Sequence, residues 1–237
     1  MKILVKILIN IICIITLIFS SLSVYIKLSE YRKADEVYTE LRENTSNNNS
    51  KHQELYDKNN DYRFWLKINN VNIDYPVVQG YNNDFYLTHD FYKNYLPLGS
   101  IFMDYRNNFE NDKSLIVYGH YMKNKTMFGQ LENYTDEVFF KENNLVEINY
   151  KVQTYTYEIF SVYTADLINR DYLSIHFNSN YEFKDYLNYI TERSVHKSDI
   201  KVDISDKIIT LYTCNYEFKD ARTIVHAKLI SKKETDK

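Results

Sequence analysis

The chain begins with a long apolar stretch and then becomes polar before the first strand pattern. Residues 7–26 carry no charge and are mostly apolar over 20 positions, about the length of a helix that spans a bilayer. Residues 28–43 have a charged pattern compatible with a helix, and residues 44–50 form a polar, low-complexity hinge. Residues 51–60 are expected to form a second short helix, which leads into a strand near Phe64.

Short apolar runs separated by polar loops follow, which is typical of a closed or nearly closed β-barrel. The expected strands cover residues 71–78, 100–104, 114–118, 145–150, 154–163, 208–214 and 223–230. Helical interruptions are expected around residues 126–132 and, over a longer stretch, at residues 181–194. In the longer one, apolar side chains recur every three or four positions, as on one face of a helix: Phe183, Tyr186, Leu187 and Ile190. The fold class is therefore mainly β.

Three segments are expected: a membrane anchor at residues 1–27, a helical stalk and linker at 28–60, and a single barrel domain at 61–237. Positive charges near the N-terminus favour a cytoplasmic start, although others follow the apolar run. Ser21-Leu-Ser23 also fits a cleavage site, so a removed signal peptide is the alternative. The apolar run continues past those serines, which favours a single-pass anchor.

Composition narrows the possible functions. The 237 residues are 44% hydrophobic and can bury one sizeable core. Only 4 Gly and 2 Pro stand against 24 Tyr and 13 Phe, which favours a β-rich body with aromatic surfaces. The net charge of −3 provides no basic field, so nucleic acid is not an expected partner. The cysteines and histidines lack the spacings of metal sites, and neither a metal nor a cofactor is expected.

A lone thiol ends one apolar strand pattern. The run Thr-Leu-Tyr-Thr-Cys214 is followed by Arg222, and the other cysteine, Cys13, lies in the apolar N-terminal segment. We expect no disulfide between them. If residues 208–214 and 222–229 pair as a hairpin, Cys214 and Arg222 lie at its loop end, on the faces directed away from the core. A lone cysteine is most often a small core hydrophobe, but this position favours a site.

A histidine lies at the end of another strand pattern. Residues 114–120 indicate a buried strand that ends in a glycine and then His120. A histidine there is often structural or merely exposed, so its weight comes from the combination with the thiol and the guanidinium. The other histidines lie in a linker, in loops, near a helix end or within a strand: His52, His89, His176, His196 and His226. Within its strand, His226 is expected on the same polar face as Arg222 and Lys228.

These motifs resemble those of sortases. Thr-Leu-Tyr-Thr-Cys214 with Arg222 is similar to the TLxTC…R signature of that family, and Tyr-Gly-His120 matches its histidine motif. Four further segments resemble class B sortases in order and spacing: Trp65–Gln79, Asn83–Leu87, Gly99–Asn107 and Gly119–Phe128. The similarity covers roughly residues 60–232.

The resemblance implies a closed sortase-like β-barrel with a long helix before the cysteine strand and an extracellular catalytic domain on a membrane anchor. It implies a cysteine transpeptidase that cuts the C-terminal sorting signal of a secreted protein after threonine, through a thioester on Cys214. An amine of a peptidoglycan precursor would then take the acyl group. His120 would act as acid and base, and Arg222 would hold the substrate and stabilise the oxyanion.

Substrate contacts implied by the resemblance fall at Asn83, Leu87, Tyr172, Leu173, Tyr212 and Thr213. Tyr212 departs from the serine common in the family, so its phenol is expected to narrow the groove or to donate a hydrogen bond. Asp104 and Arg106 belong to a matched motif and are expected to form a structural ion pair rather than to act in catalysis.

Two other functions compete with this interpretation. A membrane-anchored cysteine peptidase would use the same thiol and imidazole for hydrolysis, but papain-like enzymes have the cysteine before the histidine. A non-enzymatic binding module would use Cys214 and His120 only for packing. Formation of a thioester with a sorting-signal peptide separates these alternatives.

Overall fold

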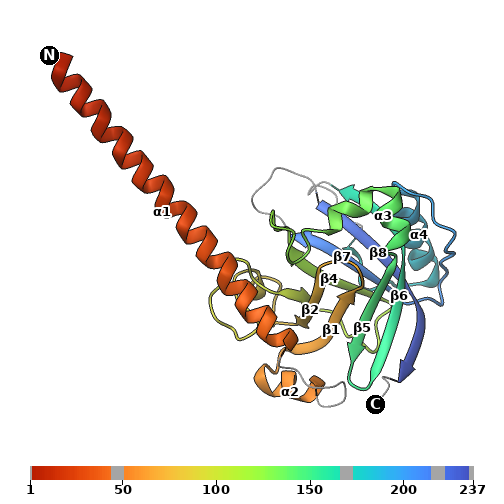
Figure 1. Cartoon of the computed structure of the whole chain (residues 1–237). Helices are drawn as coiled ribbons and strands as arrows, with labels where there is room; N and C mark the ends of the chain where they lie inside the picture. Colours follow the sequence, from red (N-terminus) through yellow and green to blue (C-terminus); the bar gives the residue numbers. More distant parts are fainter. Residues whose placement is uncertain (1, 44–50, 166–172, 215–221, 235–237) are drawn as a thin grey trace.

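The described strands close into a barrel from which one long helix projects (Figure 1). The computed structural model of the chain describes residues 2–43, 51–165, 173–214 and 222–234. The strands are β1 (Tyr62–Ile68), β2 (Ile73–Val78), β3 (Ile101–Met103), β4 (Ser114–His120), β5 (Leu145–Tyr150), β6 (Gln153–Ala165), β7 (Ile208–Cys214) and β8 (Arg222–Glu234). Their order around the barrel is β1-β2-β3-β4-β7-β8-β6-β5. The closed barrel expected from the sequence is confirmed.

Strand β7 is buried on both faces, which explains why its sequence is apolar almost throughout. Alternation directs Leu211 to the same side as Val225 of β8, its partner in the antiparallel ladder. On the other side, Thr210 hydrogen-bonds the side chain of Tyr186, which comes from the helix α4. The barrel core therefore lies behind β7 and a helix covers its outer face.

Helix α4 (Asn180–Glu192) confirms the longer predicted helix. Its first turn is capped by Ser179, whose hydroxyl accepts from the backbone N–H of Glu182 at 3.1 Å. The carboxylate of Glu182 in turn accepts from the backbone N–H of Asn178 at 2.7 Å. All of the apolar positions that the sequence assigned to one face are buried: Phe183, Tyr186, Leu187 and Ile190.

The shorter helical interruption lies further along the chain than residues 126–132, where it was expected. A 3₁₀ turn, η2, occupies Leu131–Thr135, and helix α3 covers Glu137–Glu142. Asp136 caps α3 by accepting from the backbone N–H of Phe139 at 2.9 Å. Gly129 ends the preceding turn against the carbonyl of Met122, where a Cβ would come within 2.3 Å. The helical turns therefore begin at Leu131, at the end of the expected range, and continue beyond it.

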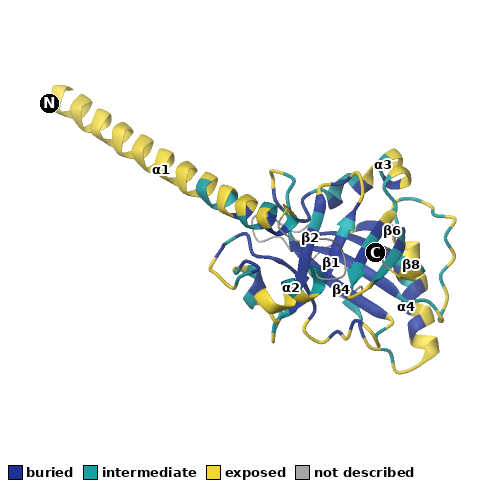
Figure 2. Cartoon of the chain, turned by 60° about the horizontal axis from the view of Figure 1, so that its bottom comes forward, coloured by how far each residue is buried: buried dark blue, intermediate teal, exposed yellow. Residues whose placement is uncertain are grey.

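Helix α1 (Lys2–Glu43) is continuous from the apolar stretch into the segment expected to be a stalk. Its apolar part is exposed, and it is the one described helix long and apolar enough to cross a membrane (Figure 2). Its last turns behave differently, because Ala34, Tyr38 and Leu41 are buried against the barrel domain. Helix α2 (Lys51–Lys58) also buries a leucine there. The segment is helical as expected, but it packs on the domain. The hinge at 44–50 lies outside the described residues.

Candidate active site

The parallel pairing of β4 with β7 brings His120 and Cys214 together. In this ladder His120 is the backbone partner of Cys214, and both residues end their strands. Neighbouring strands lie about 4.8 Å apart, and paired residues in a parallel ladder point to the same face. The side chain of Cys214 is outside the described part of the structure. The backbone register therefore sets residue 120 directly beside residue 214.

The antiparallel pairing of β7 with β8 adds Arg222 to these strand ends. Tyr212 pairs with Ile224, and the backbone N–H of Thr223 donates to the Thr213 hydroxyl, so the ends of β7 and β8 that carry Cys214 and Arg222 lie side by side. Strand pairing of residues 208–212 with 224–228 is therefore as predicted, while the connecting residues 215–221 are outside the described structure. We call His120, Cys214 and Arg222 the strand-end row.

The guanidinium of Arg222 is buried and only partly satisfied. The residue is 7% exposed, and its Nε and Nη1 atoms are buried without a hydrogen-bond partner among the described residues. Burying a cation whose donors are unpaired is costly. A peptide carbonyl or an oxyanion placed beside Arg222 would supply acceptors for these donors.

His120 is held in place through its ring and its backbone. Its Nε2 lies 2.7 Å from the carbonyl oxygen of Leu87, and because a carbonyl only accepts, Nε2 carries the proton in this contact. In a neutral ring the proton-accepting nitrogen is then Nδ1. The backbone N–H of Phe128 donates to the carbonyl of His120 at 3.1 Å. A Cβ on Gly119 would come within 2.6 Å of the Phe128 ring, which explains the glycine before the histidine.

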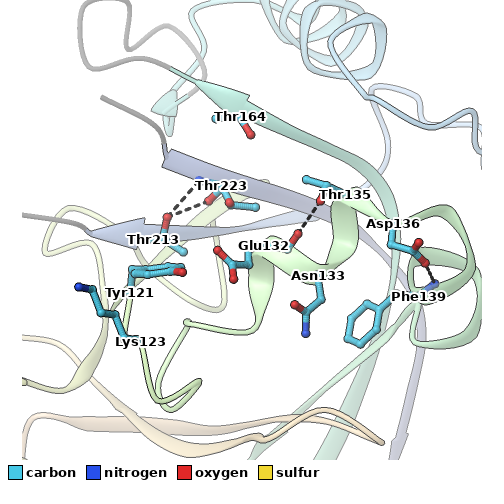
Figure 3. A pocket seen from close by; sticks show the side chains of 10 residues that line it. All are labelled: Tyr121, Lys123, Glu132, Asn133, Thr135, Asp136, Phe139, Thr164, Thr213 and Thr223. Atoms are coloured by element: carbon cyan, nitrogen blue, oxygen red, sulfur yellow. Dashed lines mark hydrogen bonds between the residues drawn. The ribbon is translucent and has the colours of Figure 1, made fainter. Parts of the chain in front are cut away.

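Two pockets flank the strand-end row. One, of about 810 Å³, has threonines of three adjacent strands on one side and residues of η2 on the other (Figure 3). Thr164, Thr213 and Thr223 form the threonine side, and Glu132 faces them. The second pocket, of about 440 Å³, is lined by His120 itself, and Tyr121 contributes to both.

Thr213 and Tyr212 both lie immediately before Cys214 but differ in surroundings. The Thr213 hydroxyl accepts from the backbone N–H of Thr223 at 3.0 Å, so it fastens the ends of β7 and β8 while lining the larger pocket. Tyr212 is 6% exposed, and its ring packs edge-on against Tyr118 with centroids 5.5 Å apart. The structure therefore packs the Tyr212 ring against its neighbour instead of exposing it.

The remaining expected substrate contacts are spread more widely. Leu87 ends the 3₁₀ turn η1 (Phe85–Leu87) and lines the pocket that contains His120. Asn83 is bound on both sides of its amide, to the Asp104 carboxylate at 2.9 Å and to the backbone N–H of Tyr105 at 3.0 Å. Leu173 is partly buried against the core. Tyr172 lies outside the described residues.

Asp104 and Arg106 form the expected structural ion pair. Arg106 donates to both carboxylate oxygens of Asp104, at 2.9 and 2.8 Å, and the Tyr118 hydroxyl donates at 2.9 Å. Burial alone would raise the pKa of Asp104, but the hydrogen bonds from Arg106, Asn83 and Tyr118 outweigh it and lower the pKa below its ordinary value. This network fixes the loop that follows β3.

His226 corrects one expectation. Its strand face was expected to point away from the core, yet the residue is completely buried. Its Nδ1 lies 2.9 Å from the Thr210 hydroxyl and its Nε2 lies 2.9 Å from the Tyr163 hydroxyl. Burial lowers its pKa to about 3, so the ring stays neutral. The outer face of β8 is covered because the chain after β6 packs over it.

Sequence reasoning missed the parts of the site that carry no motif. The Leu87 carbonyl that contacts the His120 ring is a backbone group, so the residue type at position 87 does not indicate it. Helix α1 contributes Glu30 and Tyr31 to the pocket of His120, from a segment interpreted as a stalk. The described residues contain no group of three or more His, Cys, Asp or Glu side chains able to hold a metal ion.

Comparison with known proteins places this arrangement in a family. A family model described as the sortase domain matches residues 66–230. Sortase B of Listeria monocytogenes is 38% identical over 207 residues, covering 84% of this chain and 83% of the relative. The X-ray structure of Clostridium perfringens sortase B is 41% identical and superposes with a TM-score of 0.73, covering 76% of this chain and 99% of that one.

A Staphylococcus aureus sortase B–substrate complex is 29% identical and has a TM-score of 0.77, covering 86% of this chain and 98% of that one. The family match, residues 66–230, includes all three positions of the strand-end row. The expectation of a non-enzymatic binding module is therefore wrong. The chain belongs to the sortase family, as a class B sortase, and is a cysteine transpeptidase.

Proposed function

We propose that the enzyme cleaves the C-terminal sorting signal of a secreted protein after a threonine and transfers the protein to an amine of the cell-wall precursor. The observation that supports this proposal is the strand-end row, in which β4 with His120 and β8 with Arg222 lie on either side of β7, the strand that ends at Cys214. Such a row has a nucleophile in the middle, a proton carrier on one side and an oxyanion donor on the other.

In the first half-reaction the Cys214 thiolate attacks the threonine carbonyl carbon. The carbonyl oxygen takes the negative charge and is stabilised by Arg222, whose buried Nε and Nη1 atoms have no acceptor among the described residues. The C–N bond then breaks, and His120 gives a proton to the departing amine. The products are a thioester on Cys214 and the free C-terminal peptide.

In the second half-reaction an incoming amine attacks the thioester carbonyl. His120, now neutral, takes the proton that the amine loses as the new C–N bond forms. The C–S bond breaks and the Cys214 thiolate is regenerated. Because Leu87 engages Nε2, we assign Nδ1 as the nitrogen that exchanges this proton. The reaction needs no cofactor.

The donor peptide is proposed to contact the positions carried over from the family. Leu87 and Thr213 are supported by the pockets that they line beside the strand-end row. Asn83 would reach a substrate only through the part of its amide not held by Asp104 and Tyr105. Leu173 and Tyr172 adjoin one another in the loop before α4, and Tyr212 would act on specificity through its packing with Tyr118.

A single-pass membrane location with the barrel outside the cell is also proposed. The support is α1, whose apolar side chains from Ile3 to Leu28 are exposed, whereas Ala34, Tyr38 and Leu41 further along the helix are buried. An uncovered apolar helix of this length is stable in a bilayer but not in water. Extraction of membranes with alkaline carbonate provides the test, since an embedded protein stays in the membrane pellet. Release into the supernatant would contradict the anchor.

Thioester formation is the experiment for the reaction itself. Full-length enzyme in detergent micelles is mixed with sorting-signal peptides that contain threonine at the cleavage position, and the acyl-enzyme is sought by intact mass. The expected mass equals enzyme plus the N-terminal peptide fragment, and it should be absent in Cys214→Ala. Cleavage that persists in folded Cys214→Ala would sink the proposal. Release of acid alone, with every amine offered, would instead support the hydrolytic peptidase.

A further inference from the structure

The pocket that contains His120 is closed on one side by the N-terminal helix. Its volume is about 440 Å³, and α1 contributes Lys27, Glu30 and Tyr31 to its wall. Asp84 and Leu87 line it from the segment around η1. A pocket of this size accommodates a small part of a peptide. The helix is thus part of the wall of a cavity that reaches the strand-end row.

This wall is fixed by direct packing. The hydroxyl of Tyr38 lies 2.9 Å from the Gly99 carbonyl and 3.1 Å from the Ser100 hydroxyl, just before β3. Tyr38 also packs edge-on against Tyr75, with ring centroids 5.3 Å apart. The Tyr75 hydroxyl accepts from the backbone N–H of Met127 at 3.1 Å, in the loop that follows His120. One chain of contacts therefore runs from α1 to the segment that holds the histidine.

The order of strands determines which part of the substrate lies in this pocket. His120 lies on β4 and Arg222 on β8, on opposite sides of the strand that carries Cys214. The carbonyl oxygen of the scissile bond goes toward Arg222, whereas the nitrogen must come within hydrogen-bond reach of His120. The leaving amine and the incoming amine exchange protons with the same imidazole. Both therefore pass through the side of the row where His120 and α1 meet.

The charges of the pocket suit an amine. Glu30 and Asp84 each bring a carboxylate, and Lys27 brings the one ammonium among the described lining residues. The excess of negative charge favours a cationic amine over an anionic or purely apolar group. Tyr31 is partly buried and presents a flat wall between α1 and the loop beyond His120.

We propose that this pocket is the acceptor subsite, in which Glu30 and Asp84 attract the incoming primary amine as its ammonium, which gives one proton to solvent before the neutral amine attacks, and Tyr31 confines it beside His120. The proposal rests on the proposed function, because it requires an acyl group on Cys214. It makes α1 a part of the substrate-binding surface, and it assigns to Glu30, Tyr31 and Asp84 a role in the choice between amine and water.

The test measures how one thioester is partitioned. Full-length enzyme in detergent micelles acts on a sorting-signal peptide in the presence of glycylglycinamide, a cationic primary amine, and the ratio of transfer product to hydrolysis product is read by mass spectrometry. Both products come from the same acyl-enzyme, so general damage to Cys214 lowers them together. Glu30→Gln and Asp84→Asn should each lower the ratio about two- to fivefold, the effect of one solvent-accessible charge pair.

Matched controls lie on the same helix. Glu36 is exposed and pairs with Arg32 away from the pocket, so Glu36→Gln should leave the ratio unchanged. Tyr31→Ala should lower it about fivefold or more, as for a contacting aromatic side chain, whereas Tyr25→Ala, on an exposed part of α1, should not. With hydroxylamine, which is uncharged at neutral pH, the Glu30→Gln and Asp84→Asn effects should vanish.

The outcomes separate this proposal from the proposed function. An unchanged ratio in Glu30→Gln, Asp84→Asn and Tyr31→Ala, with circular dichroism showing folded protein, would overturn the acceptor subsite while leaving the thioester mechanism in place. A loss of equal size in Glu36→Gln would overturn it as well. Failure of the wild-type enzyme to form any thioester would overturn the proposed function, and the acceptor subsite with it.

Discussion

Strand β7 has a histidine beside it at two points, and the two histidines differ in almost every physical respect. His226 of β8 pairs with Thr210 in the middle of the strand, whereas His120 of β4 pairs with Cys214 at its end. His226 is fully buried with both ring nitrogens near hydroxyls. His120 is partly exposed and lines a pocket.

The difference teaches that position along the strand, rather than residue type, separates the buried structural histidine from the histidine proposed to react. In mid-strand, the barrel on one side and the chain before β7 on the other exclude water, and burial lowers the pKa of His226 to about 3. At the strand end the ladder stops, and the imidazole of His120 lines a pocket. Only three residues of β7 lie between Thr210 and Cys214, which mark the two environments.

The largest effect is expected when the histidine at the strand end is removed, which tests the difference between the two histidines directly. His120→Ala should reduce peptide cleavage by about a hundred- to ten-thousand-fold, the usual cost of losing a positioned acid or base. The free energy of unfolding should change little, since the ring is partly exposed. Cleavage kinetics together with urea denaturation measure both quantities. Near-normal turnover in His120→Ala would place the proton transfer elsewhere.

Arg222→Lys tests the other neighbour of Cys214. The charge is kept but the planar fork is lost, so turnover should fall about a hundred- to a thousand-fold, as when an oxyanion donor is removed. The acylation rate from single-turnover experiments is the relevant measurement, because it isolates oxyanion formation. Wild-type acylation in this variant would remove the oxyanion role from Arg222 and leave the thiol and imidazole assignments intact.

His226→Ala, in the middle of the strand, should have the opposite effects: a loss of stability with little loss of activity. It leaves the hydroxyls of Thr210 and Tyr163 without their partner and opens a cavity, so the free energy of unfolding should fall by about 2–4 kcal/mol. Turnover at a temperature where the variant is folded should stay close to that of the wild type. A large loss of activity in folded His226→Ala would mean that the two histidines are functionally coupled.

The smallest expected effect is a pH dependence. His226 has a pKa of about 3 when folded and an ordinary value of about 6.5 when unfolded, so the unfolded state alone binds its proton between these values. Its contribution therefore lowers the free energy of unfolding as the pH falls from about 6.5 toward about 3, by about 1.4 kcal/mol per pH unit. His226→Gln should make the measured slope shallower by that amount. An identical slope in both proteins would mean that His226 binds its proton in the folded state as readily as in the unfolded state.

Much of the fold follows from local patterns. The strand runs, the amphipathic face of α4 and the closed barrel are encoded in the alternation and spacing of apolar residues, each of which reports on its own segment. The antiparallel pairing of residues 208–212 with 224–228 was also predictable, because a hairpin register depends on two adjacent runs. The row with His120 was suggested by family motifs, since β4 and β7 are far apart in the sequence.

Other features were beyond local reasoning because they depend on tertiary contacts. Burial of His226 requires knowledge that the chain before β7 covers the outer sheet face, and its own strand has polar neighbours that indicated exposure. The docking of Tyr38 and Leu41 required a partner surface that a charged helical pattern does not reveal. The contact of the Leu87 carbonyl with His120 could not be predicted either, because every residue type has a backbone carbonyl.

The continuity of α1 has a consequence for how the enzyme is oriented. A helix turns by about 100° per residue, so the apolar half and the docked half of α1 share one rotational phase. Whatever holds the apolar half thereby sets the direction in which the pocket beside His120 opens. One residue inserted between Ile26 and Lys27 would rotate the barrel by about that angle relative to the apolar half of α1, without altering any side chain that lines the pocket.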